Sequence, residues 1–165
     1  LVYYFYMKIK LIIFFLVTLS SYIFSHCQIP CGIYDDATVF SQLKQHVETI
    51  HKSVDMISAL VGEQSSITDL AVQAQNQQQI VRWTMNKEEH ASKIQDTMTH
   101  YFLSQRISIP NKRDRFLTKK YTDKLSLAHE VILHSMKTKQ SLNLEHVESL
   151  EKSLLSFEEE YNKAR

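Results

Sequence analysis

The chain has 165 residues, of which 44% are hydrophobic, and its formal net charge is +1. This length supports one domain with a sizeable core, and a charge so close to zero gives no basis for binding nucleic acid or an anionic membrane surface. With only two glycines and two prolines, the composition favours long helices over tight turns.

Residues 1–25 have the features of a secretory leader. A short basic stretch at 7–10 precedes an apolar run at 11–17, and the small Ser25 lies at the expected cleavage position. We expect a leader peptidase to cut before His26, so that the mature protein has no membrane segment and is secreted or routed onward to an organelle. The alternative is an uncleaved anchor, although the apolar run is short for a span of about 20 residues.

The next stretch, HCQIPCGIY, contains both cysteines of the chain. Cys27 and Cys31 offer two soft thiolates, His26 adds an imidazole, and Pro30 and Gly32 favour a tight, non-helical path. If the mature chain begins at His26, its α-amine and the next amide nitrogen complete a planar set of two nitrogens and two sulfurs, with the imidazole in an axial position. Such a set suits nickel(II) or copper(II) better than tetrahedral zinc.

Other interpretations of the same stretch remain open at this point. In a secreted chain, Cys27 and Cys31 can form a small-loop disulfide, and the protein would then be a helical interaction module without a metal. A zinc site usually needs four ligands, and only three side chains are offered locally. A copper-binding chaperone is the third alternative.

The pattern His-Cys-x-x-Pro-Cys-Gly-x-Tyr at residues 26–34 resembles the nickel hook of the nickel-type superoxide dismutases, and the segments 87–91 and 101–102 resemble that family's second helix. The resemblance implies an enzyme that converts two superoxide ions and two protons to oxygen and hydrogen peroxide. One nickel ion per chain would cycle between the +2 and +3 states. By the same resemblance, the metal ligands are His26, Cys27 and Cys31.

The resemblance also implies roles for residues outside the ligand set. Tyr34 and Tyr101 would stand in the access channel, where they order water and gate small anions, and the chain would assemble into a homohexamer of four-helix subunits. Two positions depart from the familiar pattern. Gln42 stands where a glutamate orients the axial imidazole, and His90 stands where an arginine belongs to the same network.

From residue 35 onward the sequence is helical in pattern. Apolar residues at alternating spacings of three and four predict amphipathic helices over residues 35–61, 68–104, 114–137 and 143–163. Gly62 is expected to end the first helix, and residues 66–69 resemble a capping box before the second. The second helix has the weakest inward-facing seam: Leu70, Ala74, Val81, Met85, Ile94, Met98 and Phe102.

These elements predict an all-α fold. It is an antiparallel four-helix bundle at residues 35–165 preceded by an irregular metal-binding hook at residues 26–34. After loss of the leader, hook and bundle together form one superoxide dismutase domain over residues 26–165.

Overall fold

The structure is a computed structural model that describes residues 34–111 and 113–163, together with residues 3, 4, 6–8 and 10. The chain divides into two compact units, residues 1–34 and residues 35–165. Hook residues 26–33 and most of the predicted leader lie outside the described residues. The second unit holds the helices that position the candidate site.

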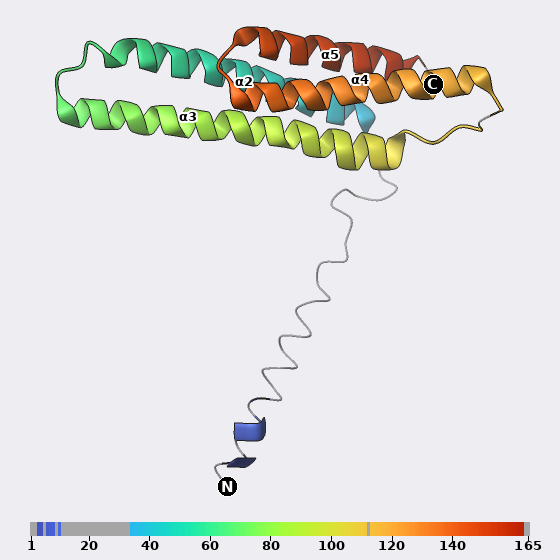
Figure 1. Cartoon of the computed structure of the whole chain (residues 1–165), viewed down its shortest axis with the longest axis horizontal. Coiled ribbons are helices and arrows are strands. Elements are labelled where there is room, and N and C mark those ends of the chain that lie inside the picture. The colour runs from blue at the N-terminus through green and yellow to red at the C-terminus, as the bar shows by residue number, and fades with distance from the viewer. Residues whose placement is uncertain (1–2, 5, 9, 11–33, 112, 164–165) are drawn as a thin grey trace. The chain divides into compact units, whose positions relative to one another are not determined.

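The second unit is a bundle of antiparallel helices (Figure 1). Its elements in chain order are α2 (Asp36–Gln64), α3 (Leu70–Asp96), η1 (Thr97–Arg106), α4 (Arg115–Gln140) and α5 (Leu144–Asn162). α2 packs on α3 and α5, and α4 packs on the same two neighbours, while η1 continues α3 as a π-helix. All of the regular structure in the described part of the chain is helical, which confirms the predicted four-helix bundle.

Side-chain caps set the starts of the helices. Asp35, Asp69, Asp114 and Asn143 each accept a hydrogen bond from a backbone N–H in the first turn of the helix that follows. Asp69 is therefore itself the cap of α3, rather than the last residue of the capping box predicted at 66–69. The prediction that Gly62 ends the first helix was also wrong, because α2 continues to Gln64. Helical backbone is accessible to glycine at only a modest cost, so Gly62 alone does not stop the helix.

An aromatic cluster forms the core near the start of α2. The rings of Phe40, Phe102, Phe157 and Tyr161 pack with centroids 4.9 to 5.9 Å apart. They come from α2, η1 and α5, so this aromatic cluster ties three elements together. The seams predicted for the first and fourth helices supply most of the remaining core, which includes Leu43, Val47, Ile50, Val54, Ile57, Val147, Leu150 and Leu154.

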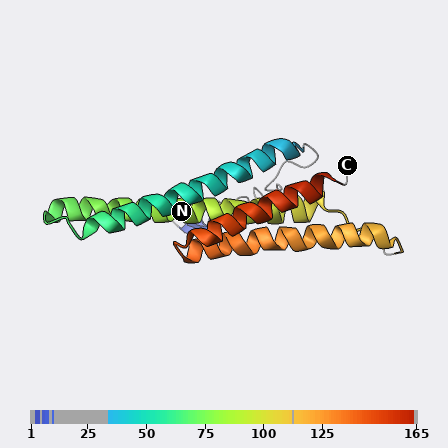
Figure 2. The same cartoon turned by 90° about the horizontal axis from the view of Figure 1, so that it is seen from above.

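The predicted seam of the second helix is wrong over its first half. Leu70 is 80% exposed, Val81 51% and Met85 67%, and Ala74 is also exposed. These four residues, called here the α3 stripe, share one side of the helix because their spacings are close to whole turns. Both views show the reason: α2 and α3 extend well beyond the ends of α4 and α5, so little of this chain is available to cover them (Figures 1 and 2).

Lys87 joins α3 to the end of α4. Its side chain is buried, and its Nζ donates to the carbonyl oxygens of Thr138 at 2.6 Å, Lys139 at 3.1 Å and Ser141 at 2.8 Å. Carbonyls at a helix C-terminus lack intrahelical donors, and a cation is favourable there. The lysine thus supplies three donors at the C-terminal end of α4.

Candidate functional site

The structure describes two of the five residues predicted for the site. His26, Cys27 and Cys31 lie outside the described residues. Tyr34 is 37% exposed and belongs to the first unit, whereas Tyr101 is 4% exposed and lies in η1 of the second. Of the five predicted site residues, Tyr101 is therefore the one that lies in the second unit.

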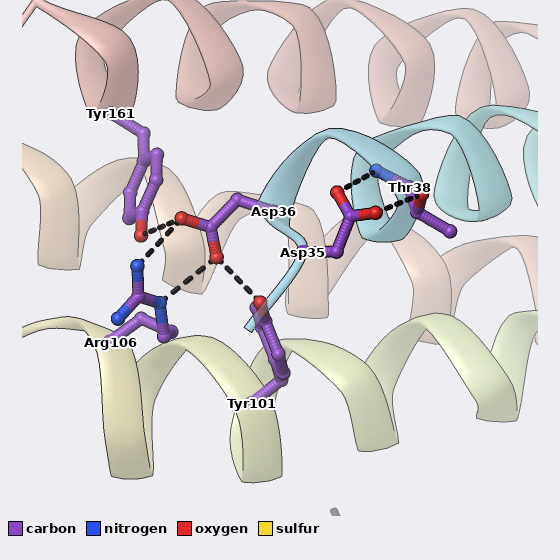
Figure 3. A network of polar contacts seen from close by, with 6 residues as sticks. All are labelled: Asp35, Asp36, Thr38, Tyr101, Arg106 and Tyr161. Carbon is purple, nitrogen blue, oxygen red and sulfur yellow. Dashed lines mark hydrogen bonds and ion pairs between the residues drawn. The ribbon is translucent and has the colours of Figure 1, made fainter. Parts of the chain in front are cut away.

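Tyr101 is part of a buried polar network around Asp36, the first residue of α2 (Figure 3). The carboxylate oxygen Oδ1 of Asp36 accepts hydrogen bonds from the Tyr101 hydroxyl at 2.5 Å and from Arg106 Nε at 2.9 Å. The other oxygen, Oδ2, accepts from Arg106 Nη2 at 2.7 Å and from the Tyr161 hydroxyl at 3.0 Å. These four residues are called here the Asp36 network.

Two adjacent aspartates have different roles at the start of α2. Asp35 is the cap: it accepts hydrogen bonds from both the backbone N–H and the hydroxyl of Thr38. Asp36 is thereby released from capping and turns into the bundle, where it is 5% exposed, and Figure 3 shows the two carboxylates pointing apart. The positive end of the α2 dipole adds to its stabilisation.

The π-helical backbone of η1 brings Tyr101 and Arg106 to the same carboxylate. In an α-helix, residues five apart point about 140° away from each other, but i→i+5 hydrogen bonding places them about one turn apart. The N–H of Ile107 bonds to the carbonyl of Phe102 at 2.9 Å, and the Ser104 hydroxyl bonds to the carbonyl of Thr99 at 2.7 Å, which are both five-residue steps. The π-helical register of η1 therefore places Tyr101 and Arg106 on the same side, where both reach Asp36.

The charges of the Asp36 network are well defined. Burial acts to raise the pKa of Asp36, but the hydrogen bonds from Arg106, Tyr101 and Tyr161 outweigh it and lower the pKa to about 2. Burial and the hydrogen bond to Asp36 together raise the pKa of Tyr101 well above its ordinary value. Hydrogen bonding to Asp36 likewise raises the pKa of Arg106. Near neutral pH the network is thus an ion pair flanked by two neutral phenols.

A second polar contact involves a position singled out by the sequence. His90 on α3 faces His46 on α2 with their Nδ1 atoms 3.0 Å apart, and Gln42 is exposed one turn earlier on α2. Burial lowers the pKa of both histidines, and the charge of Lys93 acts in the same direction. At this separation of the Nδ1 atoms, one ring donates a hydrogen bond to the other.

The described residues hold no group of three or more His, Cys, Asp or Glu side chains arranged to bind a metal ion. Among the helices of that same part of the chain, none has the length and apolar character needed to cross a membrane. Both cysteines of the chain, Cys27 and Cys31, lie outside the described residues, and their thiolates suit nickel chemically.

Comparison with known protein families decides what the chain is. The family model described as nickel-containing superoxide dismutase matches residues 21–165, which include the hook and every helix of the bundle. The chain belongs to the nickel-containing superoxide dismutase family. No curated protein and no solved structure gave a match.

Membership of this family establishes the activity. The protein is a nickel-dependent superoxide dismutase, an oxidoreductase that disproportionates superoxide to oxygen and hydrogen peroxide with nickel as its cofactor. Nothing in the match supports the alternative of a metal-free interaction module.

Sequence reasoning did not find Asp36, Arg106 or Tyr161 as partners of Tyr101. In the sequence, Asp36 lies at the start of the first helix and Tyr161 near the end of the last one, far from the motif at residues 26–34. One signal was available, since two consecutive aspartates begin a helix that needs one cap. The five-residue spacing of Tyr101 and Arg106 gave no hint, because that spacing separates two residues in an ordinary helix.

Proposed function

We propose that this superoxide dismutase binds its nickel at the N-terminal hook, through His26, Cys27 and Cys31. The observation that carries the proposal is the stretch HCQIPCGIY, which contains both cysteines of the chain and lies inside the matched region. The thiolates of Cys27 and Cys31, the Cys27 amide nitrogen, and the α-amine and imidazole of His26 would hold the ion, a donor set that suits nickel. Nickel bound there supplies the one-electron steps of the reaction.

Cleavage before His26 is part of the proposal, because the α-amine exists as a ligand only when residues 1–25 are removed. The leader brings the chain into the secretory pathway, from which it is secreted or sent to an organelle. The decisive experiment is mass spectrometry of the mature N-terminus together with metal analysis, and we expect His26 as the first residue and one nickel per chain. An intact leader, or bridged sulfurs without metal, would disprove the hook.

The donor chemistry makes nickel binding sensitive to acid. Thiols with an ordinary pKa of about 8.5 and an α-amine with one of about 8 must lose protons to bind a metal. We therefore expect mildly acidic buffer to release nickel, and Cys27→Ser or Cys31→Ser to abolish nickel binding and activity with unchanged helical circular dichroism. An active protein with one extra residue before His26 would contradict the amine ligand.

Tyr34 and Tyr101 are proposed to stand in the passage by which superoxide reaches the metal. Tyr101 is 4% exposed, so its phenol lines at most a narrow passage. A narrow, partly polar entrance favours a small anion over larger reductants. Tyr34→Phe and Tyr101→Phe should lower kcat/KM while nickel content stays complete, and loss of nickel in either variant would point to a structural role.

Assembly into a homohexamer is the last part of the proposal. The α3 stripe supports an interface between copies of the chain, because its apolar side chains lie on one side of a helix and this chain leaves them exposed. Val81→Glu should dissociate the assembly, as measured by light scattering after gel filtration. Gln75→Glu puts the same charge on an exposed position of the same helix but off the stripe, and should leave the mass unchanged. A hexameric Val81→Glu protein would exclude the stripe as the interface.

A further inference from the structure

The Asp36 carboxylate has its full complement of hydrogen bonds. An ionised carboxylate offers about four lone-pair sites, and the four hydrogen bonds from Tyr101, Arg106 and Tyr161 account for that number. The donors come from η1 and α5, and Lys124 of α4 lies 5.0 Å from the centre of the Tyr161 ring. Two elements of the bundle thus hold this carboxylate in place, and a third packs against one of its donors.

The ionised state of Asp36 fixes the direction of its hydrogen bonds. A carboxylate without a proton can only accept, so each phenol that touches it has to donate. A tyrosine hydroxyl carries a single proton, and that of Tyr101 is directed at Oδ1 over 2.5 Å. Toward any other group, the Tyr101 oxygen has only lone pairs to offer.

We propose that Asp36 is a positioning residue for the dismutase reaction. Its carboxylate accepts the hydrogen bond of the Tyr101 hydroxyl, so that the Tyr101 oxygen is a fixed hydrogen-bond acceptor in the superoxide passage. This inference rests on the proposed placement of Tyr101 in that passage. The reaction consumes two protons for each peroxide formed, and under this assignment neither comes from Tyr101. Solvent supplies them, and the Tyr101 oxygen orients a water molecule by accepting its hydrogen bond.

The same arrangement keeps negative charge out of the passage. Asp36 is neutralised by the bidentate Arg106, and its proximity to the Tyr101 oxygen opposes ionisation of that phenol. A phenolate in the passage would repel superoxide, which is itself an anion. Asp36 thus controls both the hydrogen-bond direction and the charge of Tyr101.

The first test uses nickel-free protein, so that its result does not depend on the dismutase activity. The tyrosines are labelled with ¹³C at Cζ, the Tyr101 signal is assigned by Tyr101→Phe, and its ionisation is followed with pH. In the wild type, the Tyr101 signal should stay that of a phenol at pH values where a free tyrosine, with a pKa of about 10, is ionised. Ionisation together with free tyrosine would overturn the proposal without any variant.

Asp36→Asn then removes the charge and keeps the shape. The Tyr101 signal should titrate at a lower pH than in the wild type, because no anion opposes the phenolate. Tyr161→Phe is the matched control: it removes one donor from the same carboxylate but leaves the Tyr101 hydrogen bond, so it should reduce stability without moving the Tyr101 titration. An equal shift in both variants would show that the effect is merely structural.

The nickel-loaded enzyme gives the second test. In Asp36→Asn, the alkaline limb of the kcat/KM profile should move to lower pH by roughly one unit, the shift expected from one nearby charge. Asp123→Asn, which breaks an exposed pair with Lys119, should leave the profile unchanged. A lower melting temperature in Asp36→Asn with an unchanged pH profile would overturn the positioning role. Absence of dismutase activity in wild-type holoenzyme would instead remove the proposed function and leave the titration result standing.

Discussion

At the end of the bundle where α2 begins, a buried carboxylate is surrounded by donors from two other elements and lies beside a cluster of aromatic rings. At the opposite end, α2 and α3 continue past α4 and α5 and leave apolar side chains exposed (Figures 1 and 2). The first end thus buries a charge with all of its partners. The second exposes apolar surface that a single chain does not cover.

The difference indicates how the fold divides its tasks. A fully satisfied buried charge is rigid and specific to one arrangement, which suits the positioning of a reacting group. An exposed apolar helix face costs little in a monomer and gains most when a second surface covers it. We therefore expect substitutions at the α2 start to change stability and pH behaviour, and substitutions on the α3 stripe to change assembly.

Arg106→Met should give the largest loss of stability at the α2 start. It removes the cation and two of the four donors from Asp36, and an uncompensated buried charge costs about 3–5 kcal/mol. The free energy of unfolding in urea at neutral pH measures this loss. Lys119→Met, which breaks an exposed pair, should leave the free energy of unfolding close to the wild-type value.

A second change sharpens that result. Asp36→Leu in the Arg106→Met background removes the stranded charge, so the double variant should be more stable than Arg106→Met alone. If instead the two losses simply add, then the network is not the coupled unit described above.

Lys87→Met should have the next largest effect. The three carbonyls at the C-terminal end of α4 would lose a charged donor and remain largely buried, and each such loss costs about 1–3 kcal/mol before relaxation. We expect a total of about 3 kcal/mol in the free energy of unfolding. Lys93→Met, which removes an exposed pair with Glu89 on the same helix, is the matched control. It should lower the free energy of unfolding by only a few tenths of a kcal/mol. Equal losses of stability in the two variants would mean that the buried contacts of Lys87 stabilise the fold no more than an exposed ion pair does.

Much of the bundle was predictable, because its determinants are local or repeated. The helix start near Asp35 follows from side chains a few residues from the backbone groups they cap. The seams of α2 and α5 repeat over several turns, so single ambiguous positions did not matter. The α3 stripe differs, because periodicity predicts that a face will be covered but not whether the same chain covers it.

The candidate site also has a part that is predictable from the sequence and a part that is not. The proposed ligands are contiguous in the sequence, so their chemistry can be read directly. Asp36, Arg106 and Tyr161 are up to 125 positions apart and meet only in the folded chain. The π-helix that aligns Tyr101 with Arg106 is not encoded by any local propensity, because its benefit is the long-range contact with Asp36. A sequence therefore reveals the metal donors more readily than the residues that position the chemistry around them.

Acid should weaken the α2 start by an intermediate amount. The pKa of Asp36 is about 2 in the folded chain, against an ordinary 3.8. A carboxyl group with a lowered folded pKa stabilises the protein above the unfolded value, and this contribution is lost as pH falls through the folded value. A loss on the order of 2 kcal/mol should therefore appear between about pH 4 and pH 2. Asp36→Asn should flatten that part of the stability curve, and a curve identical to the wild type would contradict the assignment.

The smallest effect is expected midway along α2, at the His46–His90 contact. Burial and the charge of Lys93 lower the pKa of both histidines below the ordinary 6.5, and the proximity of His90 adds to the lowering at His46. The unfolded chain then binds more protons than the folded one near that value, so stability should decrease as pH falls from 7.5 to 5.5. Nickel loss would occur in the same range, so the melting temperature should be compared in nickel-free protein. His46→Gln should reduce this pH dependence, whereas His51→Gln, at an exposed histidine on the same helix, should leave it as in the wild type. A pH dependence that persists unchanged in His46→Gln would assign it to other titratable groups.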